Sequence, residues 1–199
     1  KSSISAIIIL VALVTIIGLS GLNYLFLNGQ NKTANTGESD KNADLTKNTP
    51  QKLAMEKVSI TTSDNVKISA DLYGVENPIG WLVLVHMMPA TKESFKGLAQ
   101  RFQNIGYESI SIDLRGHGES DGGPNGYLNF SDAEHQKSIL DVEAAVGALI
   151  QSRNAVPEKI SLIGASIGAN LVLEFISNHP EIKAAILLSA GLNYRGIKT

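Results

Sequence analysis

The sequence predicts an α/β fold, in which helices cover both faces of a mostly parallel β-sheet. Three apolar runs carry this prediction: residues 81–86, the run that begins at Ile160, and residues 184–189. Each run is short and rich in aliphatic residues, as are strands that are buried on both faces. Helical patterns lie between the runs, and strict alternation of strands and helices is typical of a parallel sheet.

The first elements in chain order are two strands, over residues 57–61 and 66–72. The turn-forming residues Ser63, Asp64 and Asn65 separate them. We therefore expect these strands to open the domain as a β-hairpin.

Helices are expected between the remaining strands. Apolar residues fall at helical spacing over residues 95–104, before a short strand at 109–113. Further along, Ser131 and Glu134 have the spacing of a capping box, which predicts the start of one long helix that ends before Pro157. One face of that helix carries Ile139, Val142, Val146 and Leu149.

The pentapeptide GASIG, residues 164–168, lies where a strand gives way to a helix that continues to about Ser177. A G-x-S-x-G at such a junction is the pattern of a nucleophile elbow. Gly164 and Gly168 remove Cβ atoms where the strand and helix backbones approach, and the helix start leaves N–H groups free. Ser166 is therefore the candidate nucleophile and the N–H of Ile167 a candidate oxyanion donor. By itself, the pentapeptide is equally consistent with a turn that has no chemistry.

Two upstream motifs follow strands in the same way. HMMPAT occupies residues 86–91 and DLRGHGES occupies residues 113–120. Together with the elbow, they make the chain resemble the α/β-hydrolase family over about residues 55–193, and within it the esterases, lipases and serine-aminopeptidase-like enzymes. The family pattern D-x-R-G-x-G-x-S is matched at every defined position, by Asp113, Arg115, Gly116, Gly118 and Ser120.

The first motif departs from the family pattern H-G-x-P-x-x, because Met87 stands where the family has glycine. In the family this loop supplies the second oxyanion N–H. The resemblance implies that the N–H of Met88 has this role.

The resemblance also implies roles for the polar residues of these loops. The family histidine at the position of His86 usually orders the oxyanion loop and is not the base. Asp113 is expected to fix its own loop, with Arg115 as a candidate partner. His117 can reach the same rim, but it precedes the nucleophile, contrary to the family order. We expect His135, in the first turn of the long helix, to be solvated.

The family triad follows the order Ser, then Asp or Glu, then His. The only histidine after Ser166 is His179, about a dozen residues away, or about 18 Å along a helix axis. Hydrogen-bond reach is about 3 Å, so we expect a surface role for His179 and a triad acid and histidine beyond Thr199. The chain is then expected to be the N-terminal part of a longer hydrolase, inactive alone, in which later strands cover the apolar edge strand 184–189. A product that ends at Thr199 is the alternative.

The N-terminal segment predicts one transmembrane helix. No charged residue lies between Lys1 and Lys32, and residues 4–27 would span about 36 Å as a helix, enough to cross a hydrocarbon core of about 30 Å. A cleaved signal peptide is the alternative, although its apolar core has only about 7 to 15 residues. The expected organisation is a membrane anchor at 1–27, a disordered polar linker at 28–50 and a partial hydrolase domain at 51–199.

The expected location follows from this organisation. The charge of Lys1 favours a cytoplasmic N-terminus and a catalytic domain outside the cytoplasm. A protein secreted after signal cleavage is the alternative.

Composition excludes other classes. A net charge of −2 with 18% charged residues gives no basic surface for nucleic acid. The chain has no cysteine, which excludes disulfides and thiolate metal sites, and it shows no metal-ligand spacing or cofactor motif.

The sequence thus predicts a serine hydrolase that cleaves an acyl ester, lipid or peptide-like bond of a small-molecule acyl substrate through an acyl-enzyme. Acyl transfer shares that intermediate. The alternative is a non-catalytic, membrane-tethered binding domain of the same fold.

Overall fold

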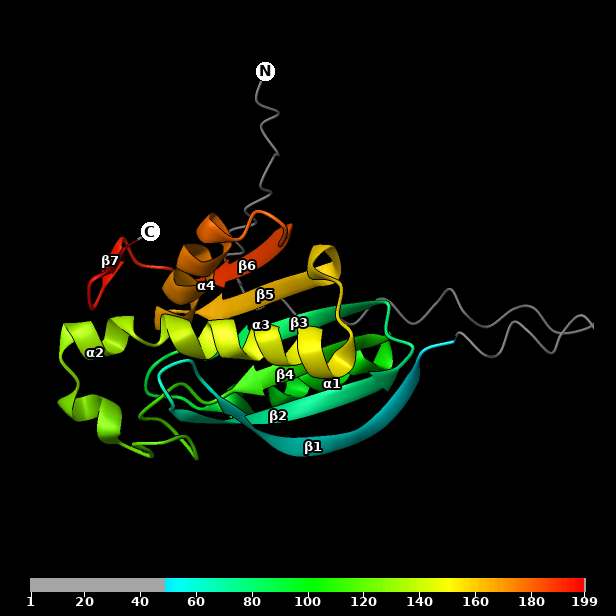
Figure 1. The fold of residues 1–199 in the computed structure, drawn as a ribbon, viewed down its shortest axis with the longest axis horizontal. Helices are drawn as coiled ribbons and strands as arrows, with labels where there is room; N and C mark the ends of the chain where they lie inside the picture. Colours follow the sequence, from blue (N-terminus) through cyan, green and yellow to red (C-terminus); the bar gives the residue numbers. More distant parts are fainter. Residues whose placement is uncertain (1–48, 199) are drawn as a thin grey trace, which may run out of the picture.

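A computed structural model describes residues 49–198 of the chain (Figure 1). Among these residues, the main sheet has six strands in the order β1-β2-β4-β3-β5-β6. The strands are β1 (Gln51–Thr61), β2 (Lys67–Glu76), β3 (Gly80–Val85), β4 (Tyr107–Ile112), β5 (Ile160–Ala165) and β6 (Ala184–Leu188). The strands from β4 to β6 are parallel to β3, whereas β1 and β2 form an antiparallel hairpin. The predicted mostly parallel sheet is confirmed.

Helices cover both faces of this sheet, as predicted (Figure 1). The 3-10 turn η1 (Lys92–Phe95) and α1 (Lys96–Asn104) pack on one face, and α3 (Ile139–Arg153) and α4 (Ile167–Asn178) pack on the other. The central strand β3 supplies both cores, because successive side chains of a strand point to opposite faces. Leu82 and Leu84 lie in the α1 core, and Trp81, Val83 and Val85 lie in the α3 and α4 core.

The opening hairpin is longer than the sequence pattern predicts. Its register runs from the pair Gln51 and Glu76 to the pair Thr61 and Lys67. Most side chains of β1 are exposed, so its first half lacks the alternation of apolar and polar residues by which a half-buried strand is recognised.

The predicted long helix is two helices. The capping box of Ser131 and Glu134 is present, but it begins the short helix α2 (Asp132–Gln136), and α3 starts only after Lys137 and Ser138. Both intervening residues have ψ near zero, outside the usual range of an α-helix.

The expectation that His135 is solvated is wrong, because its side chain is buried. Its ring packs against Phe130, with centroids 5.4 Å apart. These two residues flank the cap of α2 at the positions of a hydrophobic staple. The same pattern that caps the helix therefore buries the histidine.

The chain beyond β6 folds back on the start of α4. The ribbon of β7 (Asn193–Tyr194) and β8 (Ile197–Lys198) is held by the buried amide of Asn170. Its nitrogen donates to the carbonyls of Gly191 and Ile197 at 2.8 and 2.9 Å.

No helix within residues 49–198 is long and apolar enough to cross a membrane. The predicted anchor at 1–27 lies outside the described residues, as does the linker apart from residues 49–50.

Candidate active site

The residues singled out in the sequence lie at one edge of the sheet. His86, Asp113 and Ser166 come directly after β3, β4 and β5. The register places the end of β3 level with Ile112 of β4 and Gly164 of β5. Because the three strands are parallel, their carboxyl ends meet at the edge where such sheets bind ligands.

Ser166 has the backbone conformation of a sharp, strained turn. Its φ of 51° and ψ of −117° lie in a region that residues with a Cβ rarely adopt. The neighbouring glycines are required at this turn, because a side chain would clash there. A Cβ on Gly164 would lie 2.2 Å from the Gly168 carbonyl oxygen. A Cβ on Gly168 would lie 2.3 Å from the carbonyl oxygen of Val85. The elbow is therefore pressed directly against the end of β3.

The start of α4 places backbone donors beside the serine. Ile167 is the first residue of α4, where the N–H has no partner within the helix. The N–H groups of Ala169 and Asn170 turn back to the Ser166 carbonyl at 2.9 and 3.2 Å. On the other side, the Ser166 N–H donates to Leu188 of β6 at 2.8 Å. The turn is thus fixed from both neighbouring elements, while the Ser166 side chain stays half-buried.

His86 is buried at the end of β3 and uses both ring nitrogens. Nδ1 donates to the Met87 carbonyl at 2.8 Å, and Nε2 accepts from the Leu114 N–H at 3.1 Å. Burial lowers the pKa of His86 to about 4, against the opposing hydrogen bond to Met87. The ring is therefore neutral near pH 7 and joins the β3 loop to the β4 loop, in keeping with the ordering role expected for it.

Met88 lies in the turn that follows. The Ala90 N–H donates to the Met87 carbonyl at 2.9 Å and closes this turn. Met88 is half-buried, whereas Met87 is exposed. Met87 has no positive φ, so its backbone conformation does not require the glycine that the family has there.

Asp113 does not pair with Arg115, and that expectation is wrong. Its Oδ1 accepts from the Lys92 N–H at 2.7 Å, and its Oδ2 accepts from Lys92 Nζ at 2.6 Å and from the Glu119 N–H at 2.9 Å. Gly118 permits this arrangement, because a Cβ there would lie 2.2 Å from Asp113 Oδ2.

Arg115 points instead toward α3 and the β1–β2 turn. Its backbone N–H and its Nε donate to the buried carboxylate of Asp141, at 2.8 and 2.9 Å. Its guanidinium also pairs with Asp64, at 2.7 Å. Asp113 instead pairs with Lys92, the first residue of η1.

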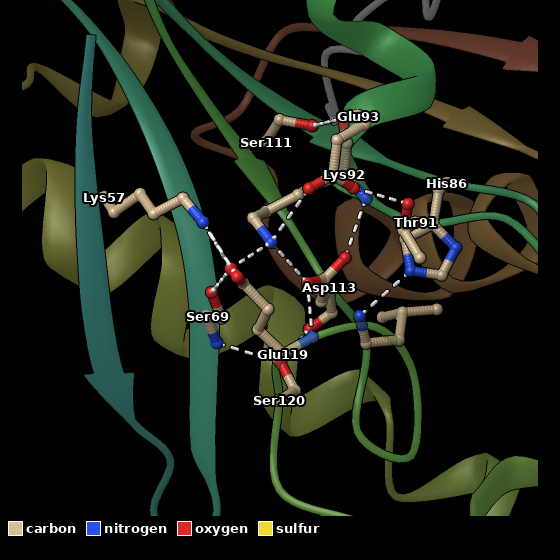
Figure 2. A network of polar contacts seen from close by, with 11 residues as sticks. Lys57, Ser69, His86, Thr91, Lys92, Glu93, Ser111, Asp113, Glu119 and Ser120 are labelled. Atoms are coloured by element: carbon tan, nitrogen blue, oxygen red, sulfur yellow. Dashed lines mark hydrogen bonds and ion pairs between the residues drawn. The ribbon is translucent and has the colours of Figure 1, made fainter. Parts of the chain in front are cut away.

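Lys92 is the residue at this edge that the sequence reasoning missed. Its side chain is fully buried, and Nζ also donates to Glu119 Oε2 at 2.8 Å (Figure 2). Burial opposes the charge of the ammonium, but the hydrogen bonds to Asp113 and Glu119 outweigh burial and raise the pKa of Lys92. Hydrogen bonds from Lys57 and Lys92 lower the pKa of Glu119 to about 2. The sequence signal for this contact was a lysine between the HMMPAT and DLRGHGES motifs, the second of which begins with Asp113.

His117 is buried beside His86, with ring centroids 5.0 Å apart. It stacks on Tyr127 at 4.1 Å, and its Nδ1 lies 3.0 Å from the Arg115 carbonyl. Gly116, at φ 75°, lets Phe130 and Tyr127 approach this loop. His117 is thus enclosed by the loop that covers the β4 end, and burial lowers its pKa.

His179 lies at the far end of α4, away from Ser166. Its Nδ1 is 2.9 Å from the carboxylate of Glu181, and its ring stacks on Phe175. Within residues 49–198, no hydrogen bond joins the Ser166 hydroxyl to a histidine or a carboxylate. The described part of the chain therefore holds the candidate nucleophile and the candidate oxyanion donors without a base bonded to Ser166. It also contains no cluster of three or more potential metal ligands.

The chain is similar to known proteins in sequence and fold. The family described as "Serine aminopeptidase, S33" matches residues 76–197. Among curated proteins, the chain is 28% identical over 133 residues to the AB hydrolase superfamily protein YisY of Bacillus subtilis (strain 168). It is 26% identical over 125 residues to a thermostable monoacylglycerol lipase of Bacillus sp. (strain H-257). The matches cover 66% and 63% of this chain, but only 44% and 46% of the two relatives, so the chain spans about half their length.

Solved structures extend the likeness to three dimensions. An esterase from Pyrococcus furiosus superposes with a TM-score of 0.56 at 26% identity, covering 69% of this chain and 50% of the esterase. The α/β-hydrolase GrgF from Penicillium sp. sh18 superposes with a TM-score of 0.60 at 23% identity, covering 69% of this chain and 46% of GrgF. The latter likeness concerns the fold alone.

Proposed function

Because the chain belongs to the serine aminopeptidase (S33) family of α/β-hydrolases, we propose that it carries the nucleophile and the oxyanion donors of a serine hydrolase that cleaves acyl esters. The observation that carries the proposal is the conformation of Ser166. Strained backbone at a functional position persists only when the surrounding structure enforces it, and here the close approach of Gly164 and Gly168 does so.

In the proposed reaction, Ser166 Oγ attacks the carbonyl carbon of the substrate and the carbonyl oxygen becomes an oxyanion. The N–H groups of Ile167 and Met88 donate to that oxyanion, and each such donor contributes about 3 to 4 kcal/mol of transition-state stabilisation. Collapse of the intermediate expels the alcohol and leaves an acyl-enzyme on Ser166. Water then releases the acid and restores the hydroxyl.

The reaction needs a base to take the Ser166 proton and return it to the leaving alcohol. His86 does not fit this role, because both of its ring nitrogens are engaged. We assign the base and its orienting carboxylate to residues outside 49–198. The length of the relatives, about twice that matched by this chain, supports this assignment.

The ester class follows from the relatives. A monoacylglycerol lipase is similar to this chain in sequence, and an esterase is similar to it in sequence and fold. An acyl ester of a small alcohol is therefore the first substrate class to assay, ahead of peptide-like bonds.

The proposal is tested with p-nitrophenyl acyl esters and a fluorophosphonate probe on the purified full-length protein, which includes the residues assigned above as the base and its carboxylate. We expect turnover and labelling in the wild type and loss of both in Ser166→Ala. The matched control is Ser177→Ala, which removes an exposed hydroxyl at the other end of α4 and should change neither. Turnover that persists in Ser166→Ala would overturn the proposal, and a folded wild type with neither activity nor labelling would favour the binding-domain alternative.

We also propose that residues 1–27 anchor the protein in a membrane, with the hydrolase domain outside the cytoplasm. Support comes from the uncharged apolar run described above. Retention in carbonate-washed membranes and digestion of the domain by protease added to intact cells are the expected results. Release of a shortened soluble protein would point to signal cleavage instead.

A further inference from the structure

The buried ammonium of Lys92 lies between two loops of the proposed site. Every polar group of this residue contacts the end of β4 or the loop after it. Its N–H and Nζ donate to the two carboxylate oxygens of Asp113, at 2.7 and 2.6 Å, and its carbonyl accepts from Ser111 Oγ at 2.8 Å. Nζ also reaches Glu119, 2.8 Å away. Lys92 is therefore attached by its backbone and its side chain to one neighbouring strand end.

This attachment is the second of two that hold the β3 loop. At the start of the loop, His86 Nε2 accepts the Leu114 N–H. At its end, Lys92 binds Asp113, the residue next to Leu114. The residues between them, 87–91, include Met88. The two attachments reach Leu114 and Asp113, which are consecutive residues after β4. Residues 87–91 are therefore held at both ends.

Glu119, the second carboxylate bound to the Lys92 ammonium, is itself held by side chains of the antiparallel strands. Glu119 accepts from Lys57 on β1 at 2.8 Å and from the Ser69 hydroxyl on β2 at 3.3 Å. Figure 2 shows the Lys92 ammonium between the carboxylates of Asp113 and Glu119, with Lys57 and Ser69 on the other side of Glu119. The cation is thus tied to the antiparallel part of the sheet as well as to β4.

Stability alone does not account for a buried lysine here. Well-packed apolar residues in place of a buried ion pair are often as stable or more so. An apolar side chain would not, however, bind the Asp113 carboxylate, which already receives the N–H groups of Lys92 and Glu119. The cation lets one carboxylate hold both loops at once.

We propose that Lys92 is a positioning residue, which holds the backbone of residues 87–91 through Asp113 so that the Met88 N–H stays aimed at the substrate oxyanion. The catalytic part of this inference rests on the proposed hydrolase function, whereas the structural part does not. Oxyanion donors act by being held in place before the reaction, and a misplacement of about 1 Å costs on the order of 100-fold in rate.

The test is Lys92→Met, which removes the charge and keeps the length of the side chain. Its matched control is Arg153→Met. Arg153 also pairs with a buried carboxylate, Glu108, at 2.7 Å, but at the opposite end of β4. Lys92→Met breaks a fully buried ion pair and Arg153→Met a partly buried one at the same sheet, and only Lys92→Met touches the β3 loop.

Two readouts are compared in the same purified full-length protein. Amide hydrogen exchange of residues 87–91 should accelerate at least about 10-fold more in Lys92→Met than in Arg153→Met, after correction for global stability. With a p-nitrophenyl ester, Lys92→Met should lower kcat about 10- to 100-fold and leave KM within about threefold, whereas Arg153→Met should leave kcat unchanged. If Lys92→Met does not fold, Glu119→Gln removes one partner of the cation and should show the same changes to a smaller extent.

The outcomes separate the two proposals. Equal exchange of residues 87–91 in the Lys92 and Arg153 variants would overturn the positioning role, whatever the activity. Faster exchange in a protein whose wild type has no Ser166-dependent turnover would support the attachment and refute the proposed hydrolase function. Faster exchange with unchanged kcat in an active enzyme would overturn the link between Lys92 and the oxyanion donor.

Discussion

Gly168→Ala tests whether close approach of backbones builds the elbow. The added Cβ would lie 2.3 Å from the carbonyl oxygen of Val85 and 2.7 Å from that of His86. A carbon–oxygen contact is comfortable near about 3.3 Å, so α4 and the end of β3 must separate by about 1 Å. Both contacts are to backbone atoms of the central strand, so no side chain can rotate away to relieve them.

Two effects follow from that separation. Strain of this kind in a close-packed site costs about 1 to 3 kcal/mol in the free energy of unfolding. Ser166 and Met88 lie on opposite sides of the widened contact, so the rate of ester cleavage should fall on the order of 100-fold. Urea unfolding followed by tryptophan fluorescence measures the first effect, because Trp81 is the only tryptophan and is buried.

The control is Gly97→Ala in α1, where a Cβ would meet nothing within 4 Å. Alanine in an open helical position should stabilise the protein by about 0.5 to 1 kcal/mol relative to glycine and leave activity unchanged. If Gly168→Ala unfolds at the same urea concentration as the wild type, the elbow glycine is not required by packing and the reasoning is refuted.

Three further predictions concern pH, the ribbon and activity. Acidification from pH 7 to pH 5 should destabilise the fold by about 2 kcal/mol through His86, because burial lowers its folded pKa to about 4 while the unfolded chain takes up a proton near pH 6.5. This loss, measured by unfolding at each pH, should be smaller in His86→Gln; equal slopes would contradict it. Asn170→Leu should cost about 1 to 3 kcal/mol by removing the hydrogen bonds from its amide to the carbonyls of residues 191 and 197. Amide exchange should become faster only in residues 191–197, and uniformly faster exchange would contradict this. The 199-residue chain alone should show no ester turnover that depends on Ser166. Assay of this chain beside its Ser166→Ala variant checks this directly.

The parts of the fold that sequence predicted are those that depend on local periodicity. Strands β3, β5 and β6 are runs of aliphatic residues, and each lies within a residue or two of its predicted range. The elbow was recognisable for the same reason, because its glycines, its serine and the helix after it are contiguous. Local spacing also identified the capping box of Ser131.

The errors arise where contacts join distant residues. Periodicity shows that a cap is present, but the length of the helix behind it depends on what the helix packs against, and α2 ends after five residues. Likewise, Lys92 and Asp113 are 21 residues apart, and only the crossover through α1 brings η1 over the end of β4. Arg115 was the nearer cation in sequence, yet the turn after Asp113 directs it to α3 and Asp141.

The order of the strands explains how these distant contacts serve one site. In the order β4-β3-β5, the central strand has the glycine-rich loop on one side and the elbow on the other. The loop after β3 is therefore the only one of the three that borders both, and its conformation decides the distance between Met88 and the serine turn. Gly168 sets that distance from the elbow side, by allowing α4 to touch the carbonyls of Val85 and His86. Lys92 and His86 set it from the other side, by attaching the loop to Asp113 and Leu114. The proposed oxyanion donor on this loop needs both constraints, because release of either one would move its N–H relative to Ser166, the proposed nucleophile.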